Sequence, residues 1–482
     1  MNSVFLVRRT RLRHALFGLM LIAVCAPAVF GKAGPAFKLV GKEVFIPGRP
    51  GVRVVAQAFY VRSEGQEMIS RYSEQTKSDK ADIAYQRFSH DNGRTWSTPA
   101  MLVTNERVSG GAVGPTPSSA HSVSAPVTNE SAPGGTRRRA MKPGFVDPTR
   151  DVLVTVFQEA ILPTDNPLEG MKYWTLHYAL SRDGGKTNYH EGPIVHKGTE
   201  YSHEHPLPNV WVGKNSAMIG DTACVPIRIR TGEILQPIQI TPIGPDGEYY
   251  NPGGGYTYHD SAVLIARWND SGILDWELSK LVKGDATRST RGMLEPTIIE
   301  APDGRILMVL RGSNDRKPEL PGYRWYAVST DHGRSWSPPK PWTYDNGESF
   351  HSPSSCSQLL GHSSGRICWI GNISPSNPRG NSPRYPLVIG EVDPESLLLR
   401  KDSVLVIDDR LPGEPEWTAL SNFYAREDRI SREIVVHLSP IGKGLAQSSR
   451  PVVQATQPTF EWTADAWVYR IAVLMAEPRK RE

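Results

Sequence analysis

Residues 329–336, Ser-Thr-Asp-His-Gly-Arg-Ser-Trp, are the stretch that decides the fold. In such an octet the Asp carboxylate accepts backbone N–H groups of a turn, the Gly takes the left-handed conformation, and the Trp fills an apolar gap. The form Ser-x-Asp-x-Gly-x-Ser/Thr-Trp is complete again at 89–96. It recurs at 181–188 with Asn188 in place of Trp, and 267–276 resembles a degenerate copy. One turn that ends unit after unit indicates a repeat architecture.

The segments between these turns have the pattern of short β-strands. The 12 Trp, 17 Tyr, 43 Gly and 40 Pro, with few long apolar helical runs, are typical of an all-β protein with many turns. Four-stranded sheets arranged radially, a β-propeller, explain a turn that recurs in each unit, whereas the alternative, a β-sandwich, does not. We predict strands or hairpins at 52–61, 67–73, 82–88, 151–158, 173–181, 297–311, 323–329, 357–372, 385–392, 419–424, 433–439 and 467–475.

The hairpin before the octet at 329–336 brings two opposite charges together. Its turn is Pro302-Asp303-Gly304, and Glu295 and Arg311 lie at equal distances in sequence from Asp303. In an antiparallel pair such residues are near-opposite, at roughly 4.5–5.5 Å between Cβ atoms. The pattern predicts a carboxylate–guanidinium pair at the strand ends away from the turn, either as part of a site or as an ordinary cross-strand ion pair.

The octets resemble the Asp-box (BNR) repeats of the sialidase superfamily, whose members are six-bladed β-propellers. The resemblance covers nearly the whole chain after residue 31. It implies a sialidase-like propeller in which Asp91, Asp183 and Asp331 are structural residues on outer turns, away from the central site. Asp-boxes are specific for the propeller and not for a reaction, so the site residues have to be matched one by one.

Sialidases bind the substrate carboxylate through three arginines. The first belongs to an Arg-Ile-Pro motif on the first blade, where this chain has Arg53 followed by Val-Val. The family's Glu and second arginine share a hairpin, as Glu295 and Arg311 do here. The third arginine precedes a strand late in the chain, and Arg384 in Pro-Arg-Tyr-Pro-Leu-Val matches it, with Arg379 as the alternative.

The remaining catalytic residues of the family match less closely. A further arginine precedes the catalytic aspartate, and Arg71 and Asp79 resemble that pair, with Asp82 as the alternative aspartate. Sialidases use as nucleophile a Tyr followed by Ser near the end of the fold. This chain has Leu420 where the Tyr is expected, and the nearby Tyr424 is the candidate nucleophile.

These residue types suit the hydrolysis of a terminal acidic sugar. Guanidinium groups bind a planar carboxylate bidentately, which only Arg does. By the resemblance, Asp79 would protonate the leaving oxygen and Glu295 would activate a Tyr, a neutral nucleophile that avoids repulsion beside a carboxylate sugar. The prediction is an exo-glycosidase similar to exo-α-sialidases, acting on sialic acid or a related sugar of a glycan or glycoconjugate, without a cofactor.

Two other functions stay open. One is a propeller that binds glycans without turning them over. The other is a lyase or hydrolase of polyuronates with His203, His205 or His259 as the base. The His-x-His of the first two has no third and fourth ligand at recognisable spacing, so no metal site is expected.

Residues 1–31 have the pattern of a secretory signal, with four arginines, an apolar run at 15–24 and then small residues. We expect an exported protein, periplasmic or extracellular, whose propeller domain spans 32–482 and which does not stay inserted in a membrane, because the apolar run is short. The four arginines carry most of the formal charge of +5, since 51 basic and 50 acidic residues remain without them. Nothing in this balance favours nucleic acid as a partner.

Residues 104–144 are rich in Gly, Ser, Pro and Ala, which predicts an exposed loop insertion with solvated arginines at 137–139. Cys356 and Cys368 flank a turn, and whether they form a disulfide depends on the strand register. Cys224 is expected to be a small buried residue.

Overall fold

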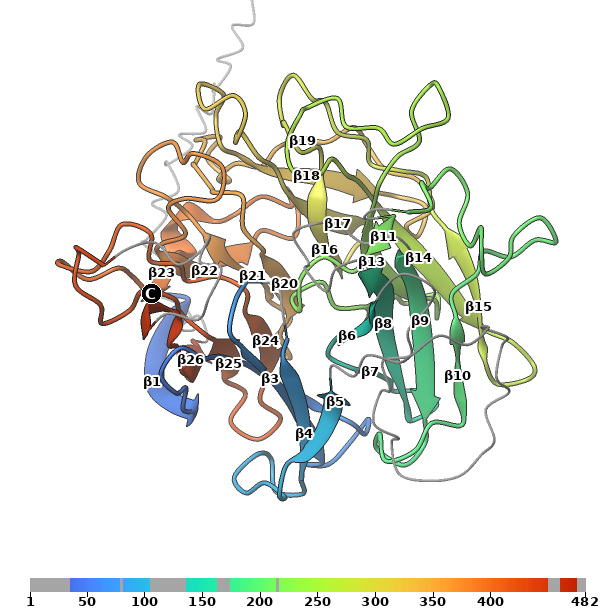
Figure 1. The fold of residues 1–482 in the computed structure, drawn as a ribbon, viewed down its shortest axis with the longest axis horizontal. Helices are drawn as coiled ribbons and strands as arrows, with labels where there is room; N and C mark the ends of the chain where they lie inside the picture. The colour runs from blue at the N-terminus through green and yellow to red at the C-terminus, as the bar shows by residue number, and fades with distance from the viewer. Residues whose placement is uncertain are drawn as a thin grey trace, which may run out of the picture.

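The computed structural model describes residues 35–78, 81–104, 136–162, 174–213, 216–449 and 460–474. Within these ranges the chain forms six antiparallel sheets arranged around a central axis (Figure 1). The helical elements described are two 3₁₀ turns, η2 (Lys401–Ser403) and η3 (Phe460–Trp462). The predicted all-β, six-bladed propeller is confirmed. The predicted signal segment, 1–31, lies outside the described residues.

The strands of each blade follow one another in the sheet in nearly the order of the chain. Blade 1 contains β2 (Arg53–Tyr60), β3 (Met68–Gln75), β4 (Ile83–Ser89) and β5 (Ala100–Thr104). Blade 2 contains β6 (Thr136–Met141), β7 (Phe145–Asp147), β8 (Val152–Leu162), β9 (Trp174–Ser181) and β10 (His190–Pro193). Blade 3 contains β11 (Ala217–Met218), β12 (Ile227–Arg228), β13 (Ile234–Ile240), β14 (Asp260–Trp268) and β15 (Leu274–Leu278). Blade 4 contains β16 (Leu294–Glu300), β17 (Ile306–Arg311), β18 (Arg324–Ser329) and β19 (Lys340–Pro341). Blade 5 contains β20 (Gln358–Gly361), β21 (Ile367–Asn372), β22 (Leu387–Val392) and β23 (Leu405–Asp408). Blade 6 contains β24 (Tyr424–Glu427), β25 (Ile434–Leu438), β26 (Ala466–Val473) and β1 (Phe37–Ile46).

Strand β1 closes the ring. It comes from the start of the described chain, yet it is the outer strand of blade 6, where it pairs antiparallel with β26. The register runs from Phe37 opposite Val473 to Ile46 opposite Ala466, with two bulges. Because one sheet contains both ends of the described chain, the backbone hydrogen bonds of that sheet hold the first and last blades together.

The octets lie on equivalent turns, between the last two strands of blades 1, 2 and 4. In the first, Asp91 Oδ1 accepts the backbone N–H of Thr95 at 2.9 Å and its Oδ2 accepts the Thr95 hydroxyl at 2.6 Å. These bonds, with one from the Ser89 hydroxyl, lower the pKa of Asp91 to about 2. Asp183 and Asp331 make the same set of bonds. The degenerate copy is the corresponding turn of blade 3, between β14 and β15.

Apolar side chains fill the space between neighbouring blades. A cluster between blades 4 and 5 combines Leu307 and Val309 of β17 with the rings of Trp342 and Trp369. The two rings meet edge to face, with centroids 5.3 Å apart. Such rings bury large apolar areas, so this contact contributes to the adhesion between the blades.

Three local expectations are corrected. The predicted strand at 419–424 is wrong, because β24 begins only at Tyr424. Part of the predicted loop 104–144 is strand, since β6 pairs with β8 along the whole of 136–141, while 105–135 lie outside the described residues. Arg139 is therefore not a solvated loop residue, and it forms ion pairs with Glu159 and Glu191.

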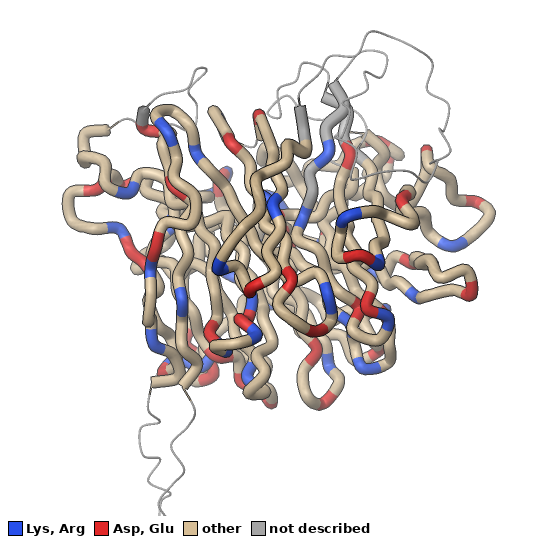
Figure 2. Tube along the Cα trace, turned by 90° about the horizontal axis from the view of Figure 1, so that it is seen from below, with Lys and Arg blue, Asp and Glu red and all other residues tan. Residues whose placement is uncertain are grey.

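The cysteines of the described chain are free thiols. Cys356 and Cys368 are both buried and are not bridged, and Cys224 is buried as expected. Figure 2 shows acidic and basic residues interspersed over the body of the molecule. None of the helices described is long and apolar enough to cross a membrane.

Candidate active site

The predicted carboxylate–guanidinium pair lies on the face opposite the Asp-box turns. In an antiparallel blade the start of the first strand, the end of the second and the start of the third share one edge. Glu295 lies near the start of β16 and Arg311 ends β17, whereas Asp331 follows the end of β18. Glu295 and Asp331 therefore lie at opposite edges of this blade, separated by the length of its strands.

Glu295 reaches Arg311 through an irregularity in the hairpin. The residue paired with Arg311 is Leu294, and the register shifts between Leu294 and Thr297. Glu295 has φ of 42°, and its Oε1 accepts a hydrogen bond from Arg311 Nη1. A β-bulge of this kind redirects a side chain. The predicted partnership is present, with the bulge displacing the expected register by one residue.

Arg311 is held by more than its carboxylate. Its Nε donates to Ser354 Oγ at 2.8 Å and its Nη2 donates to Asn381 Oδ1 at 3.1 Å. Arg384, which precedes β22, donates from Nη2 to the carbonyl of the same Ser354 at 3.0 Å. Two guanidinium groups from different blades thus meet at one serine.

A second carboxylate, that of Asp221, is linked to Arg384 through Asn422. Asn422 receives a hydrogen bond from Arg384 Nη1 at 3.5 Å and donates to Asp221 Oδ2. Asp221 Oδ1 also accepts from the backbone N–H and hydroxyl of Thr222, at 2.6 and 2.9 Å. The same hydroxyl lies 3.1 Å from the carbonyl oxygen of Phe423, so its one proton is shared between the two acceptors. Blades 3 and 6 are therefore linked at this point.

We call the set Asp221, Glu295, Arg311, Arg384 and Asn422 the arginine cluster. The segments that contain Asp221 and Glu295 pack closely against each other. A Cβ atom added to Gly220, the neighbour of Asp221, would lie 2.6 Å from Glu295 Cγ. Glu295 Oε2 is buried and has no hydrogen-bond partner among the described residues. The cluster thus offers one carboxylate oxygen that is not yet engaged.

The charge around the cluster is positive. Arg291 and Arg324 are near enough that their charges act on the same groups. Burial, and then the charge of Arg311, lower the pKa of Arg384. Arg324 is fully buried and donates to Ser352 and Ser355, which indicates a structural role. The cluster's two guanidinium groups balance its two carboxylates, so the neighbouring Arg291 and Arg324 supply the excess of positive charge that favours an anionic ligand.

His259, a candidate base, lies beside this group. It is 1% exposed, and burial, followed by the charge of Arg291, lowers its pKa to about 3. Its Nδ1 has no partner among the described residues. The imidazole is therefore neutral at physiological pH. His203 and His205 lie instead on an exposed loop, and no group of three potential metal ligands occurs in the described chain.

Two other predicted arginines have different surroundings. Arg53 donates from Nε and Nη2 to Ser439 of blade 6, and its guanidinium lies 5.8 Å from the Trp462 ring. Arg71 donates to Gln86 at 2.9 Å and to a backbone carbonyl at 3.0 Å. Burial lowers the pKa of Arg71 to about 10. These contacts place Arg53 against blade 6 and Arg71 against β4 and the segment between β6 and β7.

The predicted aspartate and the predicted nucleophile have different outcomes. Asp79 lies outside the described residues, and its alternative Asp82 accepts hydrogen bonds from Thr76. The structure corrects the prediction that Tyr424 is the nucleophile. Its ring is 7% exposed and belongs to an apolar cluster with Phe59 and Ile69, between blades 6 and 1. The side chain is therefore packed in the core and is not placed to act as the nucleophile, and burial raises its pKa to about 12.

Sequence reasoning missed Asp221, Asn422 and Ser354. Asn422 lies within the stretch 418–424 that was matched to the family nucleophile, and its φ of 64° is a conformation that Asn tolerates better than most residues. That stretch was a usable signal. No such signal in the sequence marks Asp221 or Ser354, because the residues that they contact are remote in sequence.

Comparison with known proteins agrees with this fold. Residues 174–404 match the BNR repeat-like domain family. A protein of unknown function from Dyadobacter fermentans aligns with a TM-score of 0.53 at 14% identity, over 91% of this chain and 100% of that chain. The NanB sialidase of Streptococcus pneumoniae aligns at 0.51 and 12%, over 91% and 70%. The intramolecular trans-sialidase of Ruminococcus gnavus aligns at 0.51 and 13%, over 90% and 97%.

A search of curated proteins found no match. At such identities the structural likeness is one of fold. An inference about the reaction therefore depends on the residues of the arginine cluster.

Proposed function

We propose that this chain, a sialidase-like BNR-repeat β-propeller, is an exo-glycosidase that removes a terminal acidic sugar from glycans, with the sugar's carboxylate bound at the arginine cluster. The observation that carries the proposal is the convergence of Arg311 and Arg384 on Ser354, beside the carboxylates of Glu295 and Asp221. Guanidinium groups match the planar geometry of a carboxylate.

Glu295 is the residue best placed to assist the reaction. Arg311 engages its Oε1 and holds the carboxylate, while Oε2 has no partner among the described residues. In the proposed step, Oε2 takes a proton from a water molecule whose oxygen forms the new bond to the anomeric carbon. The glycosidic bond breaks, and its oxygen receives a proton from an acid, for which Asp79 remains the expectation.

The test is a panel of fluorogenic sialosides and uronides with the purified protein and two variants. Glu295→Gln keeps the shape of the side chain but removes the base, so turnover should fall at least 100-fold while binding of the free sugar acid is largely retained. Arg384→Lys should instead weaken binding of the sugar acid, because the fork of donors is lost. Turnover that is unaffected by Glu295→Gln would refute the proposed role.

A glycan-binding propeller without turnover is the second candidate. It is favoured by Tyr424, which is packed in the apolar core, and by Asp221, whose two oxygens already accept hydrogen bonds. Binding of an acidic sugar by titration calorimetry, with no product from any substrate of the panel, would select this candidate.

Export through residues 1–31 is part of the same proposal, since a glycan at a cell surface is the natural substrate of such an enzyme. The basic, apolar and small segments in that order support it. N-terminal sequencing of the protein from the periplasm or medium should begin near residues 29–32. A sequence that begins at Met1 would refute cleavage.

A further inference from the structure

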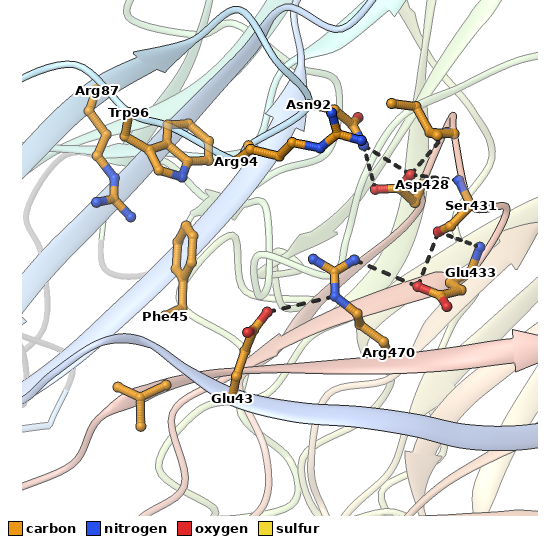
Figure 3. Close-up of a pocket in the computed structure, with 13 residues that line it drawn as sticks. Glu43, Phe45, Arg87, Asn92, Arg94, Trp96, Asp428, Ser431, Glu433 and Arg470 are labelled. Atoms are coloured by element: carbon orange, nitrogen blue, oxygen red, sulfur yellow. Dashed lines mark hydrogen bonds and ion pairs between the residues drawn. The ribbon is translucent and has the colours of Figure 1, made fainter.

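We infer that a hollow between blades 1 and 6 is a second glycan site, one that binds a neutral pyranose unit. The hollow has a volume of about 620 Å³ and is shown in Figure 3. It is lined by the closing strand β1, by the Asp-box turn of blade 1, by the turn after β24 and by β26. Its size falls within the range of small-ligand sites.

The hollow is separate from the arginine cluster. It contains Asn92 and Arg94 of the turn that follows β4, and Asp428 of the turn that follows β24. These turns follow the ends of a third and a first strand, which share the edge opposite the cluster. A ligand here therefore cannot be the sugar bound at Arg311.

One wall of the hollow is aromatic. Phe45 and Trp96 meet edge to face, with centroids 5.8 Å apart (Figure 3). The Arg87 guanidinium lies 4.7 Å from the Phe45 ring and 4.9 Å from the Trp96 ring. These contacts hold both rings in place. Trp96 thus differs from Trp336 of blade 4, which donates to Ser279 of the neighbouring blade and packs against its core.

The opposite wall is polar and contains groups suited to sugar hydroxyls. Asp428 accepts two bonds from Asn92, at 2.9 and 3.0 Å, and Ser431 donates to Glu433 at 3.1 Å. Arg470 forms ion pairs with Glu43 and Glu433, with N–O distances of 3.7 Å, and its side chain is 39% exposed (Figure 3). Its N–H groups are thus within reach of a ligand.

The charges of the lining balance. Three guanidinium groups, those of Arg87, Arg94 and Arg470, face three carboxylates, those of Glu43, Asp428 and Glu433. A balanced lining gives no net attraction to an anion, whereas a lining with both donors and acceptors can bind hydroxyl groups. An aromatic face on the other side offers apolar contact to the C–H face of a pyranose ring. This combination selects a neutral sugar.

The test is saturation-transfer NMR on the full-length protein with methyl β-galactoside, methyl β-glucoside, methyl α-mannoside and N-acetylneuraminic acid. At least one neutral pyranoside should bind, and Arg94→Ala should weaken it at least tenfold. Lys186→Ala is the matched control, because Lys186 is exposed and has the same place in the octet of blade 2. That variant should bind like the wild type.

The two sites are distinguished by Arg311→Lys. This variant should bind N-acetylneuraminic acid roughly 10- to 100-fold more weakly but keep the neutral sugar, so failure of one proposal leaves the other standing. The second site is overturned if no neutral pyranoside binds, if Arg94→Ala binds as the wild type does, or if neutral-sugar binding disappears only in Arg311→Lys. Arg94-dependent binding of the sialic acid alone would overturn the neutral assignment.

Discussion

Replacement of Arg311 by Lys tests whether the arginine cluster depends on the planar fork or only on its charge. Arg311 is 7% exposed and donates to three different residues, namely Glu295, Ser354 and Asn381. A lysine ammonium on a flexible stem can keep the ion pair with the glutamate but cannot reach the other two acceptors in the same geometry. Two hydrogen bonds from a charged donor are lost, each contributing about 1.5 kcal/mol. The free energy of unfolding should fall by about 3 kcal/mol.

Urea denaturation followed by tryptophan fluorescence measures this loss. The control is Arg49→Lys, because the exposed Arg49 side chain makes one ion pair, with Glu74, among the described contacts. Because exposed pairs contribute little, that variant should change the free energy of unfolding by less than about 1 kcal/mol. Arg311→Lys should also weaken binding of a sugar acid by roughly 10- to 100-fold, which corresponds to about 1.4–2.8 kcal/mol. Equal effects of the two substitutions on stability, with no loss of sugar-acid binding, would refute the reasoning.

Three further outcomes are expected. The pKa of Asp91 is about 2 in the folded protein and about 4 in the unfolded chain, so the ionised carboxylate stabilises the fold above about pH 4, and this stability is lost as the pH falls toward about 2. Asp91→Asn should therefore reduce the fall in melting temperature with decreasing pH, and an unchanged fall would contradict this. Trp336→Ala removes a ring that is only partly buried, so calorimetry should show a loss of about 2–3 kcal/mol, below the usual range for full burial, with sugar-acid binding intact. Asn422→Ala removes the link between Arg384 and Asp221, and titration calorimetry should show at least tenfold weaker binding of a sugar acid; wild-type affinity would mean that the link is only structural.

The interactions that could be predicted from the sequence are those whose partners are close along the chain. The carboxylate of each Asp-box binds groups four residues away, so the turn forms wherever the octet occurs. Glu295 and Arg311 are brought together by a single hairpin turn. The repeated turn implied the propeller, and the hairpin implied one half of the arginine cluster.

The start of strand β24 determines where the Tyr424 side chain lies. The sequence places it near the expected nucleophile, but the strand begins at this residue and directs the ring into the apolar space between two blades. Because both faces of a blade pack against neighbouring blades, a side chain within the strand lies in the apolar space, whereas one in the loop before the strand can reach the site. No local pattern in 418–424 reveals where that strand starts.

The rest of the cluster depends on closure of the ring. Asp221 and Asn422 are 201 positions apart, and they meet only because blades 3 and 6 face each other across the assembled propeller. The hollow beside Trp96 likewise needs β1, from the start of the described chain, to pair with β26 near its end. The sequence determined the repeated turns and the hairpin, because their hydrogen bonds are local. Only the tertiary structure decided which remote side chains meet, because that depends on the number of blades and on the strand that closes them.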